Sequence, residues 1–267
     1  FGQMELSGGR LSYVFASETC AFDLIHAKFV RDVEPGEIVV INKDGLKSMQ
    51  AFPAHTRRAF CIFEYVYFAR PDSNVAKRNV YKVRVQMGRQ LAREKPVQAD
   101  IVVPVPDSGV PSAMGYAAES GIPYELGIIR NQYVGRTFIE PTDHIRHLGV
   151  KLKHAANRPI LRGKRVILVD DSIVRGTTSK KIVEMVRAAG AREVHMRISS
   201  PPTTHSCFYG IDTPERGKLL ASRHSVEEMG ALIGADSLAF ISKDGLYRAL
   251  GHAGRDAGRP QYCDACF

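Results

Sequence analysis

The chain has the size and composition of an ordinary globular protein and carries a net positive charge. Its 267 residues are 44% hydrophobic and 24% charged, and 37 Lys and Arg against 28 Asp and Glu give a net charge of +9. This length can bury a sizeable core, and no apolar run approaches the roughly 18 residues of a membrane span. The charge suits a polyphosphate ligand or nucleic acid. Because the basic residues are scattered and no DNA-binding motif is present, we expect no nucleic-acid partner.

The first 50 residues differ in pattern from the rest. Short strands are predicted at 11–17 and 37–41, and a helix is predicted after Ser17, which we expect to cap it. Residues 51–75, which are rich in Pro, Arg and aromatic side chains, are interpreted as a connection. The opening Phe1-Gly-Gln-Met resembles neither an initiator nor a secretion signal. We therefore expect a cytoplasmic protein whose chain begins inside a larger one.

From about residue 78 the pattern alternates between strands and helices, which favours a parallel α/β sheet with right-handed crossovers. The predicted strands are 100–105, 124–129, 166–169 and 193–198. The predicted helices are 80–93, 111–120 and 177–189. Such sheets bind ligands beyond the carboxyl ends of their strands. Residues 131–160 are polar and rich in Arg and His, and they are interpreted as a long loop, either a lid over the site or a solvated connection.

The segment 166–179 carries the strongest chemical signal, with the sequence VILVDDSIVRGTTS. Asp170 and Asp171 taken alone fit an acidic turn that caps the next helix equally well. The small residues that follow place free backbone N–H groups at a helix N-terminus, where a phosphate binds favourably. The two carboxylates can accept hydrogen bonds from ribose hydroxyls or hold hydrated Mg²⁺. The segment therefore predicts a ribose-5-phosphate site, and the Walker A spacing is absent.

A second loop follows the strand predicted at 100–105. Its residues Asp107, Ser108 and Gly109 can wrap a diphosphate with their backbone, and the Ser108 hydroxyl can reach Mg²⁺. Taken alone, the loop fits an ordinary strand-to-helix turn better.

The segment from Val166 to Thr178 closely resembles the thirteen-residue signature of the type I phosphoribosyltransferases, which bind phosphoribosyl diphosphate (PRPP). The resemblance implies an α/β fold with a parallel sheet and flanking helices. It implies Mg²⁺ ligation by Ser108, Asp170 and Asp171. The implied PRPP-binding residues are Asp107, Ser108, Gly109, Asp170, Asp171, Ser172, Val174, Arg175, Gly176, Thr177 and Thr178.

Across nearly the whole chain the sequence is similar to the glutamine PRPP amidotransferase family. Further matching segments begin at Ser17 (SETCA), Arg31 (RDVEPGE), Phe63 (FEYVYFARPDS), Tyr133 (YVGRTFI), Cys207 (CFYGIDTP) and Ser225 (SVEE). The resemblance implies that PRPP and ammonia, taken from glutamine in the complete protein, give 5-phosphoribosylamine and diphosphate, the first committed step of purine synthesis. It implies a homotetramer inhibited by purine nucleotides. It also places Arg130, Tyr133 and Arg136 by the PRPP site and an ammonia passage.

The same resemblance suggests a domain layout. Residues 1–50 match the end of an N-terminal-nucleophile (αββα) glutaminase domain, 51–77 a connection, 78–250 the phosphoribosyltransferase domain and 251–267 a C-terminal tail. The nucleophile of such a glutaminase is a first-residue Cys, and residue 1 here is Phe. We therefore expect this chain alone not to use glutamine.

Two departures from the family pattern affect the lid. Gln132 stands where the family usually has Arg, and Lys151-Leu-Lys-His replaces its usual Arg-x-Lys-Leu.

Five cysteines occur, and disulfides are not expected in a cytoplasmic protein. Cys263 and Cys266 have the spacing of metal ligands, which by itself also fits zinc, redox chemistry or unrelated buried thiols. The resemblance favours a [4Fe–4S] cluster, with Cys61 and Cys207 as the other two ligands.

Two other functions remain open from the residues. A PRPP-sensing regulator would need a DNA-binding module, which is not visible. A salvage transferase would use a purine base as acceptor, against which the amidotransferase motifs argue.

Overall fold

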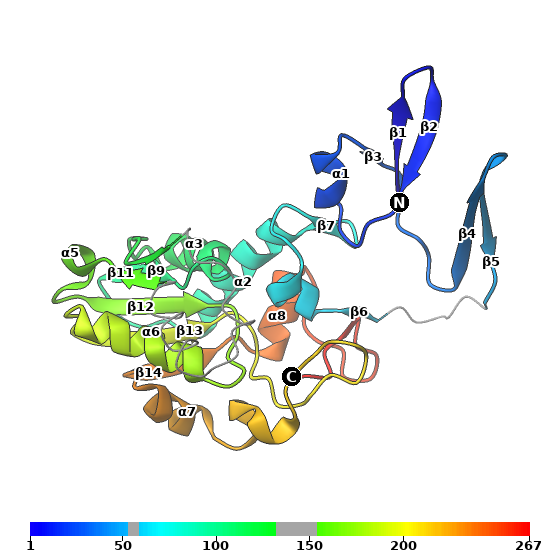
Figure 1. Cartoon of the computed structure of the whole chain (residues 1–267). Helices are drawn as coiled ribbons and strands as arrows, with labels where there is room; N and C mark the ends of the chain where they lie inside the picture. Colours follow the sequence, from blue (N-terminus) through cyan, green and yellow to red (C-terminus); the bar gives the residue numbers. More distant parts are fainter. Residues whose placement is uncertain (53–58, 132–153) are drawn as a thin grey trace, which may run out of the picture.

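Four parallel strands form the central sheet (Figure 1). The computed structural model describes residues 1–52, 59–131 and 154–267. In spatial order the strands are β14 (Ser237–Phe240), β13 (Glu193–Ile198), β12 (Arg165–Asp170) and β9 (Ile101–Pro104). The expected parallel sheet is confirmed, and all four strands end at the same edge.

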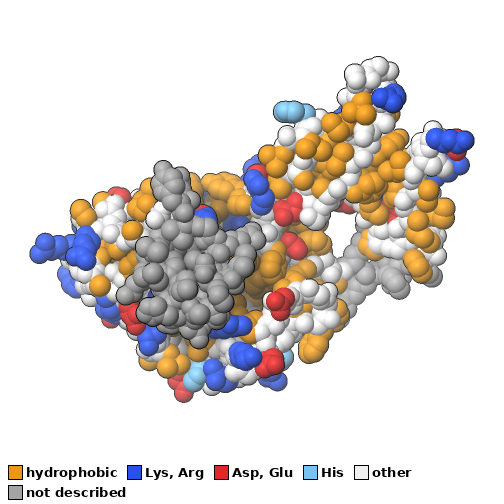
Figure 2. All heavy atoms as spheres, in the orientation of Figure 1, with side chains coloured by type: hydrophobic (Ala, Val, Ile, Leu, Met, Phe, Trp, Pro, Cys, Tyr) orange, Lys and Arg blue, Asp and Glu red, His pale blue; other side chains and the backbone are white. Residues whose placement is uncertain are grey.

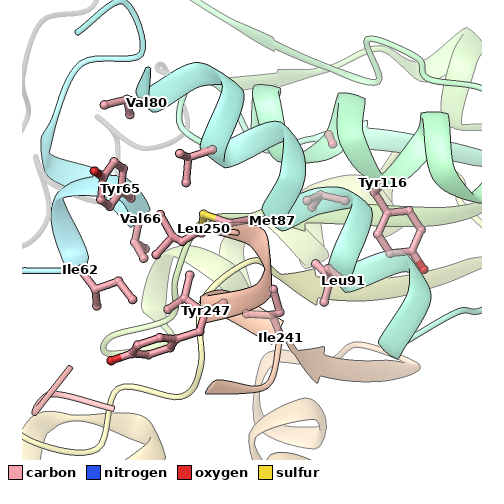
Figure 3. Close-up of a cluster of buried hydrophobic side chains, with 14 of the residues drawn as sticks. Ile62, Tyr65, Val66, Val80, Met87, Leu91, Tyr116, Ile241, Tyr247 and Leu250 are labelled. Carbon is pink, nitrogen blue, oxygen red and sulfur yellow. The ribbon is translucent and has the colours of Figure 1, made fainter. Parts of the chain in front are cut away.

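Alternate side chains of β12 enter two separate apolar clusters. Ile167 and Val169 pack with α2 (Val80–Glu94), α3 (Val110–Ser120) and α8 (Lys243–Ala249). Figure 3 labels Met87, Tyr116 and Tyr247, one residue of this cluster from each of the three helices. Val166 and Leu168 pack with α6 (Thr177–Ala188) and α7 (Val226–Ile233) on the other face. Because both faces are covered, the strand is apolar from Val166 to Val169 rather than alternating.

Helices α2 and α3 lie unusually close together because glycines face the contact. A Cβ added at Gly88 would stand 1.9 Å from the carbonyl oxygen of Ser112, and one at Gly115 would stand 2.0 Å from that of Val85. Asn79 caps α2 by accepting a hydrogen bond from the Lys82 amide at 3.1 Å. This close contact brings the backbone of α2 within reach of α3 side chains.

The predicted strand at 124–129 was only partly right. Tyr124 makes one isolated bridge to Val102, and the regular strand is β10 (Ile128–Arg130). It pairs in an antiparallel manner with β11 (His154–Ala156), away from the main sheet. The prediction of a continuous loop over 131–160 was therefore wrong at its end, where β11 is followed by α5 (Arg158–Leu161). Residues 132–153 lie outside the described part of the chain.

The segment expected to be a connection contributes to the core. It contains β6 (Phe60–Cys61), a π-helix η1 (Glu64–Phe68) and β7 (Asn74–Val75), and β8 (Arg78–Asn79) follows directly after it. Ile62, Tyr65 and Val66 are fully buried among residues of α2 and α8, as Figure 3 shows. Near the C-terminus β15 (Tyr262–Cys263) pairs with β6 in parallel.

The N-terminal residues form two small antiparallel units. One contains β1 (Gly2–Leu6), β2 (Arg10–Val14), α1 (Cys20–Leu24) and β3 (Lys28–Phe29); the other is the hairpin of β4 (Glu37–Asn42) and β5 (Gly45–Gln50). Apolar side chains are exposed on both, and Figure 2 shows them at the upper right. The expected Ser17 cap was wrong, because α1 begins after Thr19, whose hydroxyl instead accepts a hydrogen bond from the Asn74 amide at 2.7 Å. Among the described helices, none has the length and apolar character needed to cross a membrane.

Candidate active site

Two acidic residues lie where β12 ends. Asp170 and Asp171 are 8% and 5% exposed, and the Asp171 amide donates to the Asp170 carboxylate at 2.9 Å. Burial raises the pKa of both carboxyls, and the negative charge of Asp171 adds to the effect on Asp170. Hydrogen bonds from Ser108 and Ser172, together with the positive charge of Arg84, oppose the rise at Asp171. The two buried carboxylates therefore form a hydrogen-bond acceptor site, and hydrogen-bond donors or cations beside it stabilise their charged form.

The loop after β9 meets this acidic pair. The hydroxyl of Ser108 hydrogen-bonds the Asp171 carboxylate, and the Val105 amide donates to the Val169 carbonyl at 2.9 Å. Gly109 leaves no space for a side chain, since an added Cβ would stand 2.3 Å from the Val169 carbonyl oxygen. Two loops separated by sixty residues therefore share one edge of the sheet, as the sequence predicts.

The loop between β12 and α6 has the sequence Asp171-Ser-Ile-Val-Arg-Gly. Ser172 hydrogen-bonds the Asp171 carboxylate, and Val174 accepts from the Leu220 amide at 2.8 Å. Gly176 has a positive φ of 77°, and no side chain caps the helix that follows it. Arg175 and the hydroxyl-bearing Thr177 and Thr178 are exposed beside it. The first N–H groups of α6 are therefore available to an anion such as a phosphate.

Arg130, at the end of β10, reaches the first loop and forms an ion pair with Asp107. Close by, a ring nitrogen of His154 lies 3.2 Å from the Pro106 carbonyl oxygen. Sequence reasoning missed His154 because its only signal was a place in a polar, His-rich segment. The other two predicted residues of this group, Tyr133 and Arg136, lie outside the described residues.

The four cysteines expected to bind a cluster come together from distant parts of the sequence. Cys61 and Cys263 are register partners in the β6–β15 pair, and the Cys266 carbonyl accepts from the Thr204 and His205 amides at 2.9 and 3.1 Å. Burial raises the pKa of the Cys266 thiol to about 12, and negative charge on Cys61, Cys263 and Cys207 adds to the rise.

The cysteines and the oxygen donors at the sheet edge are two separate sets of candidate metal ligands. In the described ranges, no three His, Cys, Asp or Glu side chains are grouped so that they could hold a metal ion. A structural zinc site would require four ligands about 2.0–2.3 Å from a single ion. At the sheet edge the donors are two carboxylates and a hydroxyl, which are the oxygen ligands that Mg²⁺ prefers, usually alongside water and substrate phosphates.

Comparison with known proteins agrees with this architecture. The model of the phosphoribosyl transferase domain family matches residues 76–199, which include both loops and the acidic pair. This part of the chain is thus similar to a phosphoribosyltransferase domain. It superposes on the B. subtilis glutamine PRPP amidotransferase, solved in complex with ADP and GMP, with a TM-score of 0.86 at 51% identity, covering 100% of this chain and 57% of that one. Its fold is that of the type I phosphoribosyltransferases.

Sequence relatives point the same way. The chain is 62% identical over 259 residues to the amidophosphoribosyltransferase of Rhizobium etli, covering 95% of this chain and 52% of that protein. It is 54% identical over 256 residues to the Bacillus subtilis enzyme of the same name, covering 96% of this chain and 53% of that enzyme. The chain thus spans about half the length of the relatives it matches.

Proposed function

We propose that this chain forms the part of an amidophosphoribosyltransferase that joins ammonia to PRPP, releasing diphosphate and 5-phosphoribosylamine. The single observation that carries the proposal is the meeting of Ser108 with Asp171 beside the uncapped start of α6. A ribose-5-phosphate spans these groups, because the carboxylates accept from its hydroxyls and the helix N-terminus binds its phosphate. The identity to proteins named amidophosphoribosyltransferase supports ammonia as the acceptor.

The chemistry requires little covalent participation by the protein. Nitrogen attacks the anomeric carbon as the bond to diphosphate breaks, so positioning and the exclusion of water supply much of the rate. Bound Mg²⁺ would neutralise charge on the leaving diphosphate. Of this chain's residues, Asp170 and Asp171 would fix the ribose, and the backbone of 107–109 would hold the diphosphate.

We also propose a [4Fe–4S] cluster on Cys61, Cys207, Cys263 and Cys266. Thiolates are the ligands of such clusters; burial raises the pKa of the Cys61 and Cys266 thiols, so cluster binding would require each of them to release a proton. The contribution of the cluster would be structural, joining the C-terminal tail to β6 and to the loop that carries Cys207.

The complete protein is proposed to draw ammonia from glutamine through a glutaminase domain whose end is residues 1–50. The relative solved with ADP and GMP supports inhibition by purine nucleotides. We propose that the complete protein is a cytoplasmic homotetramer.

The test is a diphosphate-release assay on anaerobically purified protein with PRPP, Mg²⁺ and ammonium. We expect release by the unmodified chain and none by the double variant Asp170→Asn, Asp171→Asn. Circular dichroism and thermal unfolding would show that the double variant is folded. If the unmodified chain binds PRPP but releases no diphosphate, the transferase proposal fails and a PRPP sensor is favoured.

A further inference from the structure

The N-terminal unit of β1, β2, α1 and β3 is held to the rest of the chain at one small place. Every hydrogen bond between residues 1–29 and the described residues beyond 58 involves Glu18 or Thr19. Within the described parts of the chain, neither of the two apolar clusters contains a residue of this unit, whose own buried side chains include Phe1 and Phe22. Polar contacts of two adjacent residues therefore determine where the unit lies.

Glu18 and Thr19 bind the end of the loop that leads from η1 into β7. The Glu18 carboxylate accepts hydrogen bonds from the Arg70 amide and the Ser73 hydroxyl, both at 2.7 Å. The Thr19 hydroxyl accepts from the Asn74 amide at 2.7 Å and donates to the Asn74 carbonyl at 3.5 Å. Figure 1 shows β7 directly below α1. We call these bonds the docking contact; those to the carboxylate are of the stronger, charge-assisted kind.

The loop that receives Glu18 is itself fixed to α2. The Val80 amide donates to the Ser73 carbonyl at 3.0 Å, and the Tyr81 amide donates to the Pro71 carbonyl at 2.9 Å. These amides open α2 and have no acceptor within the helix. α2 packs against α3, which begins directly after the candidate diphosphate loop 107–109. The docking contact therefore sets the N-terminal unit against the helices that carry the candidate site.

We propose that Glu18 and Thr19 are positioning residues that hold the glutaminase domain on the transferase domain, so that ammonia released from glutamine reaches PRPP. The inference rests on the proposed function, in which residues 1–50 end the glutaminase domain. Domains joined by small polar interfaces move relative to one another by default. A carboxylate and a hydroxyl with directional bonds limit that motion. Ammonia supplied in solution does not depend on the orientation of the domains, whereas ammonia made in one domain and used in the other does.

Glu37 offers a matched control in the same N-terminal segment. Its carboxylate likewise accepts from a backbone amide, that of Glu34 at 2.7 Å, and from a serine hydroxyl, that of Ser48. It also forms an ion pair with Arg31 at 2.6 Å. All three partners belong to the N-terminal residues, so Glu37→Ala removes a comparable set of bonds and leaves the docking contact in place.

The first experiment follows the docking contact by residue-resolved amide hydrogen exchange. The amides of Arg70 and Asn74 report it directly, because Glu18 and Thr19 are their acceptors. Glu18→Ala should speed exchange of the Arg70 amide about tenfold or more, the factor that matches loss of a hydrogen bond to a charged group. Thr19→Val keeps the side-chain shape and should speed exchange at Asn74 by a smaller factor. Glu37→Ala should leave both rates within about twofold of those in the unmodified chain.

The second experiment compares two nitrogen sources in the complete protein. Diphosphate release from PRPP is measured with glutamine and with ammonium, and thermal unfolding is recorded for every variant. The double variant Glu18→Ala, Thr19→Val should lose glutamine-dependent release about tenfold or more and keep ammonium-dependent release within about twofold, because only the first requires aligned domains. Glu37→Ala should keep both activities.

Misplaced domains and a misfolded protein give different results. Unchanged exchange of the Arg70 amide in Glu18→Ala would overturn the inference, as would an equal fall of both activities in the double variant. The same loss of glutamine-dependent release in Glu37→Ala would also count against it. If the double variant does not fold, Thr19→Val alone decides by the same two measurements. If the unmodified protein releases no diphosphate with ammonium, or none with glutamine, the proposed function fails first, and hydrogen exchange, which needs no substrate, still tests the docking contact.

Discussion

The hydroxyl of Tyr247 in α8 donates to the carboxylate of Asp264 at 3.0 Å, and this contact joins the hydrophobic core to the C-terminal tail. Arg255 donates to the same carboxylate through two of its nitrogens. Tyr247 is fully buried and Asp264 is 7% exposed. Because Asp264 lies between Cys263 and Cys266, the contact fixes both cysteines relative to the core.

Replacing this carboxylate should destabilise the fold in a pH-dependent way. Burial alone would raise the pKa of Asp264, but hydrogen bonds from Arg255 and Tyr247 outweigh it, and the pKa is lowered. The carboxylate therefore stabilises the fold above the ordinary Asp pKa of about 3.9, and this is lost as the pH falls through the lowered value. Asp264→Asn should reduce the free energy of unfolding at pH 7 by about 1–3 kcal/mol.

Urea unfolding across the acid range measures the effect of Asp264→Asn. The difference in the free energy of unfolding between this variant and the unmodified chain should shrink as the pH falls below about 4. Asp256→Asn, an exposed site in the same tail, is the control and should stay near the unmodified chain. A gap that does not change with pH would show that the charge of Asp264 is not what stabilises the tail.

Gly109→Ala should disrupt the loop that meets Asp171. The added methyl group would stand 2.3 Å from the Val169 carbonyl oxygen, so the loop or the strand end must move. We expect a loss of about 1–3 kcal/mol in the free energy of unfolding and much weaker PRPP binding by calorimetry. A Cβ added at Gly217 would have no atom within 4 Å, so Gly217→Ala should change neither the stability nor the PRPP affinity. Unchanged PRPP affinity in Gly109→Ala would show that the loop does not hold the ligand.

Cysteine variants test the proposed cluster by metal content. Anaerobically purified protein should contain about four iron atoms per chain and show a brown colour. Cys61→Ser should lose most of this iron, because the substitution removes one of four thiolates. Cys20→Ser should retain it, since Cys20 is buried in α1 of the N-terminal unit. A colourless, iron-free unmodified protein, or equal iron in the two variants, would refute the assignment.

The acceptor should be ammonia alone. Diphosphate release from PRPP should occur with ammonium and not with hypoxanthine, adenine or orotate. Release with a purine base would instead identify a salvage transferase.

The sequence by itself determined the local elements that carry the ligand groups. The apolar run of β12, the two carboxylates that follow the run and the hydroxyl residues that open α6 lie close together in the chain, and the structure has strand and helix there within about one residue of the prediction. Strand 193–198 was predicted with its observed bounds. Such elements follow from periodicity and capping, which depend on residues a few positions apart.

Only the tertiary structure decided which distant groups meet. The Ser108–Asp171 hydrogen bond, the influence of Arg84 on Asp171 and the pairing of Cys61 with Cys263 join residues that lie between about sixty and two hundred positions apart. The helical period of α2 puts Arg84 on the same face as Val80, Met87 and Leu91, but it does not show which groups the guanidinium meets there. Its burial depends on η1 packing over α2, and η1 lies in a segment that composition alone marked as a connection. Contacts of this kind depend on how the layers pack, so sequence spacing does not reveal them.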